Sequence, residues 1–306
     1  MRGDGLPSAV YVAEDLAQVR LALADMQAGN LPAAALGGPE LRRLIDGSAN
    51  AAGAARHRFG ALSRFLDWCQ DAGHIQANPC TLIPRTRRPR AVQGRSHYLT
   101  PAELARLWQA ADRLGEVVWR DFARFLIAVP CRRAEAAKLD WSHLDLVAAE
   151  WRQPGHMTKN REAHRLHLHP LALEVLRERH KATGGKGLVF PAPRSGDVVK
   201  TFAAIKDALI AATSTEGKVL TGWNWHDTRR SFATALGEAG VSETVADAVL
   251  NHRQSATRGG VLGTYQRGSR WPEQMRAMGL WGKMLADAIT GGDAPANVVP
   301  MVARVG

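Results

Sequence analysis

Apolar residues recur at helical spacing through the first third of the chain. Within residues 1–90 these runs are separated by Gly and Pro, which predicts a small bundle of about four helices. The apolar positions that carry the pattern are Val12, Leu16, Val19, Leu21, Leu23, Leu41, Leu44, Ile45, Phe59, Leu62, Phe65, Leu66 and Trp68.

A second series of helices is predicted from residue 98 onward. Thr100, Pro101 and Glu103 form a capping box with Pro at the first helical position, which marks the start of a helix and of a second domain. Amphipathic helices are predicted over 117–129, 170–183, 198–212 and 271–289, and residues 291–306 are expected to form a flexible tail.

Alternating residues between two of these helices predict strands. The segment 144–151 is expected to be extended and to lead into a hairpin with Gly155 and Asn160 in its turns and Lys159 near its tip. In the returning strand His164, Leu166 and Leu168 alternate with Arg165, His167 and His169. The predicted fold class is therefore mainly α with a small antiparallel β-sheet (α+β).

The stretch from His226 to Tyr265 gathers side chains that suit phosphodiester chemistry. His226 and Arg229 are three residues apart and share a face on a helix. Gly237 and Gly240 are expected to divide the stretch into two helices, the second capped by Ser242. His252 follows the second helix, and a glycine-rich turn leads to Tyr265. Such a cluster can hold a phosphodiester and attack its phosphorus.

Positive charge dominates the chain, with a formal net charge of +11 and a pI near 10.2. Such an excess favours a polyanionic partner, either nucleic acid or an anionic membrane surface. The Pro- and Gly-containing segment 84–97 is a basic linker, either solvated or crossing a phosphate backbone, and the net charge favours the second reading. Its arginines are Arg85, Arg87, Arg88, Arg90 and Arg95.

Several other functions are disfavoured by the sequence. No apolar run reaches the roughly 18 residues of a membrane span, and three scattered cysteines indicate reduced thiols, so we expect a cytoplasmic protein. His164, His167 and His169 lack neighbouring Cys, Asp or Glu, which argues against a metal site. The glycines at 184–187 lack the spacing of a phosphate-binding loop. We expect neither a metal nor a cofactor.

Taken in order, six residues resemble the active-site set of the tyrosine recombinase (phage integrase) family, of the prophage or genomic-island type. The matching strings are R-R-A-E-A-A-K-L-D-W, T-K-N, H-D-T-R-R, L-N-H and G-T-Y-Q-R. They correspond to Arg132, Lys159, His226, Arg229, His252 and Tyr265. Three departures stand out. V-P-C replaces a usual T-G-L, so Arg133 competes with Arg132. Thr228 replaces a usual leucine, and Asn251 replaces a usual glycine.

The resemblance implies an N-terminal helical core-binding domain (1–90) that clamps DNA, the linker (84–97) and a tyrosine-recombinase catalytic domain (98–290). It implies a site-specific recombinase that integrates or excises a mobile element through a 3′-phosphotyrosyl intermediate. Arg132 and Arg229 would grip the phosphate, Lys159 would protonate the leaving oxygen and Tyr265 would be the nucleophile. The roles of His226 and His252 stay open.

The resemblance also implies partners. The protein would be a monomer when free and a homotetramer on double-stranded DNA, with host bending or directionality proteins as further candidates. The C-terminal helix, with Met275, Met278 and Trp281, would either dock on a neighbouring subunit or pack in its own chain. Two alternative functions are a DNA-binding protein that does not cleave, which the complete residue set argues against, and a relaxing topoisomerase, which the short length argues against.

Overall fold

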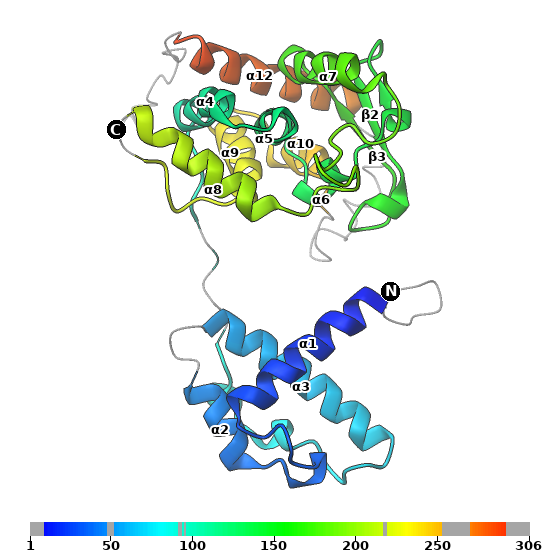
Figure 1. Ribbon diagram of the computed structural model, residues 1–306, viewed down its shortest axis with the longest axis vertical. Coiled ribbons are helices and arrows are strands. Elements are labelled where there is room, and N and C mark those ends of the chain that lie inside the picture. The colour runs from blue at the N-terminus through cyan, green and yellow to red at the C-terminus, as the bar shows by residue number, and fades with distance from the viewer. Residues whose placement is uncertain are drawn as a thin grey trace, which may run out of the picture. The chain divides into compact units, whose positions relative to one another are not determined.

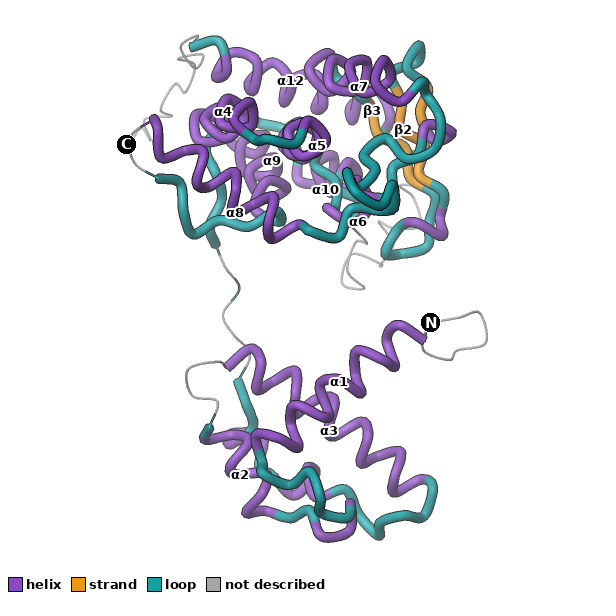
Figure 2. Tube along the Cα trace, in the orientation of Figure 1, coloured by secondary structure: helices purple, strands orange, loops and turns teal. Residues whose placement is uncertain are grey.

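The structure is a computed structural model that describes residues 9–47, 52–90, 94, 96–216, 219–252 and 270–291. The chain divides into two compact units, Met1–Arg95 and Ser96–Gly306 (Figure 1). Helices dominate both units, and the strands of the described residues form one three-stranded antiparallel sheet (Figure 2). The predicted fold class is confirmed. None of the described helices is both long and apolar enough to cross a membrane.

In the first unit the described residues form three α-helices: α1 (Ala9–Asp25), α2 (Gly38–Asp46) and α3 (Ala52–Asp71). The expected fourth helix is replaced by short 3₁₀ turns, at Pro79–Leu82 and Arg85–Arg87. Helix α1 packs along α3, and the core of the first unit includes Met26, Leu41, Leu44, Leu62 and Leu66.

Part of the apolar pattern of the first unit faces solvent. Leu16 and Leu21 on α1 and Trp68 on α3 are largely exposed, although their spacing predicted a buried stripe. A polar contact also joins these two helices, because Nε and Nη2 of Arg64 each donate to the carboxylate of Asp15 at 2.7 Å.

The second unit packs eight described α-helices around one core. They are α4 (Pro101–Ala110), α5 (Val117–Ala128), α6 (Arg133–Ala137), α7 (Pro170–Thr183), α8 (Phe202–Ala212), α9 (Asp227–Glu238), α10 (Glu243–Val249) and α12 (Trp271–Ile289), with the remaining helical turns of 3₁₀ type. The capping box at Thr100 forms as predicted, since the Thr100 hydroxyl accepts from the Glu103 amide at 3.2 Å.

Helix α12 packs within its own chain. It lies against α4, α7, α9 and α10 (Figure 1), and Met278, Trp281 and Leu285 are fully buried. The indole Nε1 of Trp281 donates to the carbonyl oxygen of Ala128 at 3.0 Å. Of the two alternatives for this helix, the structure therefore shows packing in cis.

The small sheet is formed by β1 (Leu144–Asp145), β2 (Glu150–Gln153) and β3 (His164–His167), in that order. The expected continuous strand 144–151 is wrong, because a turn interrupts it and Ala149 adopts a left-handed φ of 55°. Trp151 pairs with Leu166, and both side chains are buried in the core.

Three smaller expectations also differ from the structure. Helix α8 begins at Phe202, four residues later than predicted. Gly237 lies inside α9, and the chain turns at Gly240, whose φ of 81° a residue with a side chain rarely adopts. His169 does not share the exposed face with Arg165, because it follows the strand and is completely buried at the start of α7.

Candidate active site

Arg132 is held in place at the start of α6. It is the N-cap of this helix, and the Glu135 carboxylate accepts both from the Arg132 backbone amide (2.8 Å) and from its Nη1 (2.7 Å). Glu135 is buried, whereas the Arg132 side chain keeps 26% of its surface exposed. The ion pair fixes the guanidinium at one edge while its remaining donors stay available for a ligand.

Arg229 projects from the first turn of α9 into the protein interior. Its Nη1 donates to the carbonyl of Pro130 (2.6 Å), and its Nη2 donates to the carbonyl of Leu250 (2.7 Å). Burial, reinforced by the neighbouring charge of Arg132, lowers the pKa of Arg229 to about 10, so the side chain stays protonated at neutral pH. Its Nε is buried and has no partner among the described residues.

These two arginines are electrostatically unfavourable neighbours when the site is empty. Arg229 loses hydration on burial, and the like charge of Arg132 repels it. A bound anion would relieve both penalties at once. The unpartnered Nε of Arg229 is a further donor that a phosphate oxygen can satisfy.

His252 lies directly beside Arg229. Arg229 Nη2 is 3.2 Å from His252 Nε2, and His252 Nδ1 is 3.0 Å from a carboxylate oxygen of Asp247. Because Arg229 only donates hydrogen bonds, Nε2 acts as the acceptor and Nδ1 carries the hydrogen toward Asp247. This arrangement fixes both the tautomer and the orientation of the imidazole.

His226 stands at the N-terminus of α9 with an exposed side chain. Partial desolvation of the ring and the nearby charges of Arg229 and Arg230 lower its pKa below 6.5, so the imidazole is mostly neutral at pH 7. A neutral imidazole can accept a proton from an attacking group.

The buried carboxylate of Asp227 organises the same helix terminus, and the sequence motif did not reveal this role. Asp227 accepts from the Asn224 amide at 2.9 Å and from Arg230 Nη1 at 2.7 Å, and His97 lies 3.4 Å away. An acidic residue in the first turn of a helix was the available signal, since it complements the helix dipole.

A pocket of about 380 Å³ brings three of the predicted residues together, namely Arg132, His226 and Arg229. Arg133 also lines it, but the Arg133 guanidinium lies over the Phe202 ring at 5.1 Å. Arg132 is therefore the arginine held next to Arg229, whereas Arg133 stacks on an aromatic ring. The pocket is completed by Ala134, Asn224 and Trp225.

Lys159 does not line this pocket. It is exposed at the tip of the predicted hairpin, after the 3₁₀ turn Gly155–Met157. Its neighbour Asn160 is hydrogen-bonded to Asn251, the residue before His252. The hairpin tip is thus tied to the chain segment that carries the second histidine.

Two predicted residues, Tyr265 and Arg95, lie outside the described residues. The histidines of the disfavoured metal site have other partners: His164 Nε2 is 3.0 Å from the Val249 carbonyl, and His169 Nε2 is 2.9 Å from the Ala128 carbonyl. Across the described residues no cluster of three or more Cys, His, Asp or Glu side chains is arranged to hold a metal ion.

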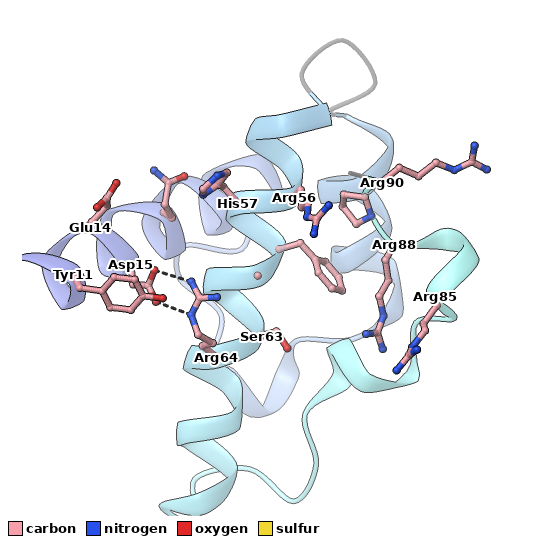
Figure 3. A pocket seen from close by; sticks show the side chains of 14 residues that line it. Tyr11, Glu14, Asp15, Arg56, His57, Ser63, Arg64, Arg85, Arg88 and Arg90 are labelled. Carbon is pink, nitrogen blue, oxygen red and sulfur yellow. Dashed lines mark hydrogen bonds and ion pairs between the residues drawn. The ribbon is translucent and has the colours of Figure 1, made fainter. Parts of the chain in front are cut away.

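The first unit contains a separate basic pocket of about 840 Å³ (Figure 3). Five arginines line it against two carboxylates: Arg56, Arg64, Arg85, Arg88 and Arg90 against Glu14 and Asp15. Within the described residues, the side chains of Arg56, Arg85 and Arg90 form no ion pair or hydrogen bond, and Figure 3 shows Arg90 extending away from α3. They are available for an anionic ligand.

Arg88 differs from the other arginines of the 84–97 segment. Its guanidinium donates to the carbonyls of Ile83 (2.8 Å), Cys80 (3.3 Å) and Thr81 (3.3 Å) and lies 5.9 Å from the Phe59 ring centre. Arg88 therefore anchors this segment onto the first unit. Arg87 is exposed and does not line the basic pocket.

Residues 97–259, more than half of the chain, match the phage integrase family, and the chain belongs to this family. The prophage integrase IntA of Escherichia coli (strain K12) is 30% identical over 174 residues, which cover 57% of this chain. The match spans only 39% of the length of that relative.

Solved structures of lambda integrase share the fold. A dimer of a lambda integrase fragment bound to a COC′ core site has a TM-score of 0.63 and 18% identity, covering 83% of this chain and 91% of that one. A lambda integrase tetramer bound to a Holliday junction has a TM-score of 0.62 and 18% identity, covering 82% of this chain and 73% of that one. At this identity the likeness concerns the fold, an N-terminal helical part followed by an integrase catalytic domain.

Proposed function

We propose that the protein is a site-specific DNA recombinase that cleaves and rejoins double-stranded DNA through Tyr265. The observation that carries this proposal is the convergence of Arg132, Arg229 and His226 on one pocket, with His252 bonded to Arg229. Membership in the phage integrase family supports it. Two cations and two imidazoles around one site suit a phosphodiester, whose negative charge must be neutralised before a nucleophile can approach.

The two arginines would bind the non-bridging oxygens of the scissile phosphate. Their guanidinium groups remain charged and present several donors in a fixed plane. Both are held by protein contacts before DNA arrives, Arg132 by Glu135 and Arg229 by the carbonyls of Pro130 and Leu250. Preorganised donors of this kind are each worth roughly 3–4 kcal/mol in a transition state.

In the proposed step the Tyr265 oxygen forms a bond to phosphorus, and the bond from phosphorus to the 5′ oxygen breaks. The phenol proton passes to a base, and Lys159 donates a proton to the leaving 5′ oxygen. The bond energy is kept in the phosphotyrosyl ester, so a 5′ hydroxyl of another strand can reverse the step without a nucleotide cofactor.

The environments of the two histidines support different roles. His226 is neutral near pH 7, exposed and on the pocket wall, which suits a proton acceptor. His252 is oriented by Asp247 on one side and accepts from Arg229 on the other, which suits a residue that steadies the phosphate-binding arginine.

The first unit would form the core-binding domain, with Arg56, Arg85 and Arg90 contacting the DNA backbone. The unpaired state of these side chains and the net charge of +11 support this role. We further propose a monomer when free and a homotetramer on two DNA duplexes, acting on bacterial DNA in the cytoplasm with host bending or directionality proteins as assistants. The proposed domains are 1–90 and 98–290, joined by the basic linker 84–97.

The test is covalent capture from a library of nicked duplexes with a randomised core, incubated with the full chain in the presence of EDTA. A nick beyond the cleavage site lets the leaving fragment diffuse away, so each cleavage leaves a protein–DNA adduct. The proposal predicts adducts that survive denaturation and share a sequence. Binding without any adduct would instead favour a DNA-binding protein that does not cleave.

A further inference from the structure

Two asparagines that lie 91 residues apart in the chain form a reciprocal side-chain contact. Asn160 Nδ2 donates to Asn251 Oδ1 at 2.7 Å, and Asn251 Nδ2 is 3.3 Å from Asn160 Oδ1. Asn160 follows Lys159 at the hairpin tip, and Asn251 precedes His252. The amide pair therefore links the two chain segments that bring these residues to the site.

The backbone at Asn251 is shaped for this contact. Asn251 has a φ of 49°, in the left-handed region that glycine adopts most easily and that asparagine tolerates better than most other residues. Glycine is usual at this position in the resembling motif. An asparagine keeps the required turn after α10 and adds an amide that glycine lacks.

The hairpin loop is stiff within itself. The Thr158 hydroxyl lies 3.0 Å from the carbonyl of Gly155 and 2.8 Å from that of Glu162, which closes the loop around Lys159. A Cβ on Gly155 would lie 2.5 Å from the Arg161 carbonyl oxygen, so the two limbs approach as closely as the backbone permits. Such a loop moves as one body when its attachment changes.

The two sides of the amide pair are anchored unequally. His252 is held by Arg229 and Asp247 whether or not Asn251 has a partner. The loop is tied to the segment before His252 at its tip by Asn160, and at its base by His164, whose ring bonds to the Val249 carbonyl. Loss of the amide contact would therefore displace the Lys159 side far more than the His252 side.

We propose that the Asn160–Asn251 pair is a positioning clamp that sets Lys159 for protonation of the leaving 5′ oxygen. This inference rests on the proposed function and adds two residues that act through Lys159 without touching the DNA. If the pair acts through Lys159, its loss should slow only the step that needs the Lys159 proton. Loss of a contact with a purely structural role would slow cleavage whether or not that proton is needed.

The test compares two suicide substrates of the captured sequence, one with the normal 5′ oxygen and one with sulfur at the bridging position. A thiolate is a far weaker base than an alkoxide and leaves without a proton. Asn160→Ala and Asn251→Gly, the second of which keeps the left-handed turn, should lower the single-turnover rate on the oxygen substrate roughly 10- to 100-fold. Both should approach the wild-type rate on the sulfur substrate, as should Lys159→Ala.

Two isosteric variants separate this role from a general loss of stability. Asn251→Asp keeps an acceptor for the 2.7 Å bond, whereas Asn160→Asp removes its donor, and both add the same charge at the same place. Asn160→Asp should therefore slow cleavage of the oxygen substrate more than Asn251→Asp does. The two variants should have similar melting temperatures and DNA affinities.

The outcomes are distinct. A wild-type rate for Asn160→Ala on the oxygen substrate, or an equal loss on both substrates, would overturn the clamp while leaving the recombinase assignment intact. Absence of an adduct from the wild-type protein on both substrates would overturn the proposed function itself.

Discussion

Arg229 combines a structural and a chemical role in one side chain. It satisfies the carbonyls of Pro130 and Leu250, which join the end of α5 to the end of α10. Truncation to Ala would leave these buried acceptors without their donor, at a cost of about 1–3 kcal/mol for each group. A loss of activity at this position would therefore mix altered folding with altered chemistry, and Arg132 is the cleaner probe.

Arg132→Ala should reduce the rate of adduct formation by about 10²–10³-fold at saturating DNA, because a preorganised donor to the transition state is lost. Arg133→Ala is the matched control from the same helix terminus. Its guanidinium stacks on Phe202, so its removal should change the rate by less than about tenfold. The measurement is single-turnover cleavage with each purified variant.

A variant of Glu135, the ion-pair partner of Arg132, provides a second test of the role of Arg132. Glu135→Gln keeps the shape of the side chain but weakens its grip on Arg132, so an intermediate loss is expected. If Arg133→Ala reduced the cleavage rate more than Arg132→Ala, Arg133 would be the phosphate-binding arginine in place of Arg132.

The sequence motifs contain the predicted site residues but do not show which side chains hold them in place. Ordered strings identified Arg132, His226 and Arg229, and the pocket contains all three. The Asn160–Asn251 contact could not be read from local sequence, because it joins positions 91 residues apart whose approach depends on the whole fold.

At the scale of elements, the contact between α12 and the start of α7 depends on close packing around His169. This ring is buried, its Nε2 bonds to the Ala128 carbonyl, and burial lowers its pKa to about 4. Gly282 of α12 faces the ring so closely that a Cβ there would lie 2.5 Å from its atoms.

Gly282→Ala should therefore lower the free energy of unfolding by about 1–3 kcal/mol, since the added methyl group must displace the buried imidazole. Gly279→Ala on the same helix is the control. Outside its chain neighbours and the backbone of its own helix, no atom lies within 4 Å of a Cβ built at Gly279, so its effect should be neutral or stabilising by up to about 1 kcal/mol. Urea denaturation measures both, and equal values would contradict the close packing.

The elements differed in how well the sequence predicted them. Helix α4 begins where its capping box and proline place it, and α7 covers the predicted range of 170–183. The continuous strand expected over 144–151 and the extension of the returning strand to His169 were wrong, because short strands are shaped by their neighbours more than by alternation. The solvent-facing apolar residues of α1 have the same spacing as buried ones, so periodicity alone could not separate them.

At the scale of the whole molecule, positive charge is concentrated in groups with different tasks. Arg64 and Arg88 stabilise the first unit, whereas Arg56 and Arg90 have no ion-pair partner among the described residues. Arg85 likewise has no ion-pair partner among the described residues, and these three arginines, not Arg64 and Arg88, are expected to exchange counterions for DNA phosphates.

DNA affinity should fall steeply with salt, and Arg56→Ala and Arg90→Ala should each reduce the slope of log affinity against log salt by about one. Arg43→Ala is the control, because Arg43 lies on α2, is paired with Glu40 and does not line the basic pocket. Fluorescence anisotropy over a range of salt concentrations provides the slopes. Equal slopes for all three variants would show that the basic pocket does not contact DNA.

Whether Tyr265 is the nucleophile can be decided by identifying the residue that carries DNA in the covalent adduct. The chain has three tyrosines, Tyr11, Tyr98 and Tyr265, and trypsin would place them in different peptides. Mass spectrometry of a nuclease-trimmed adduct should show the nucleotide on peptide 259–267, which contains Tyr265, and Tyr265→Phe should bind DNA normally without forming an adduct. An adduct on any other residue, or one that persists in Tyr265→Phe, would show that Tyr265 is not the nucleophile.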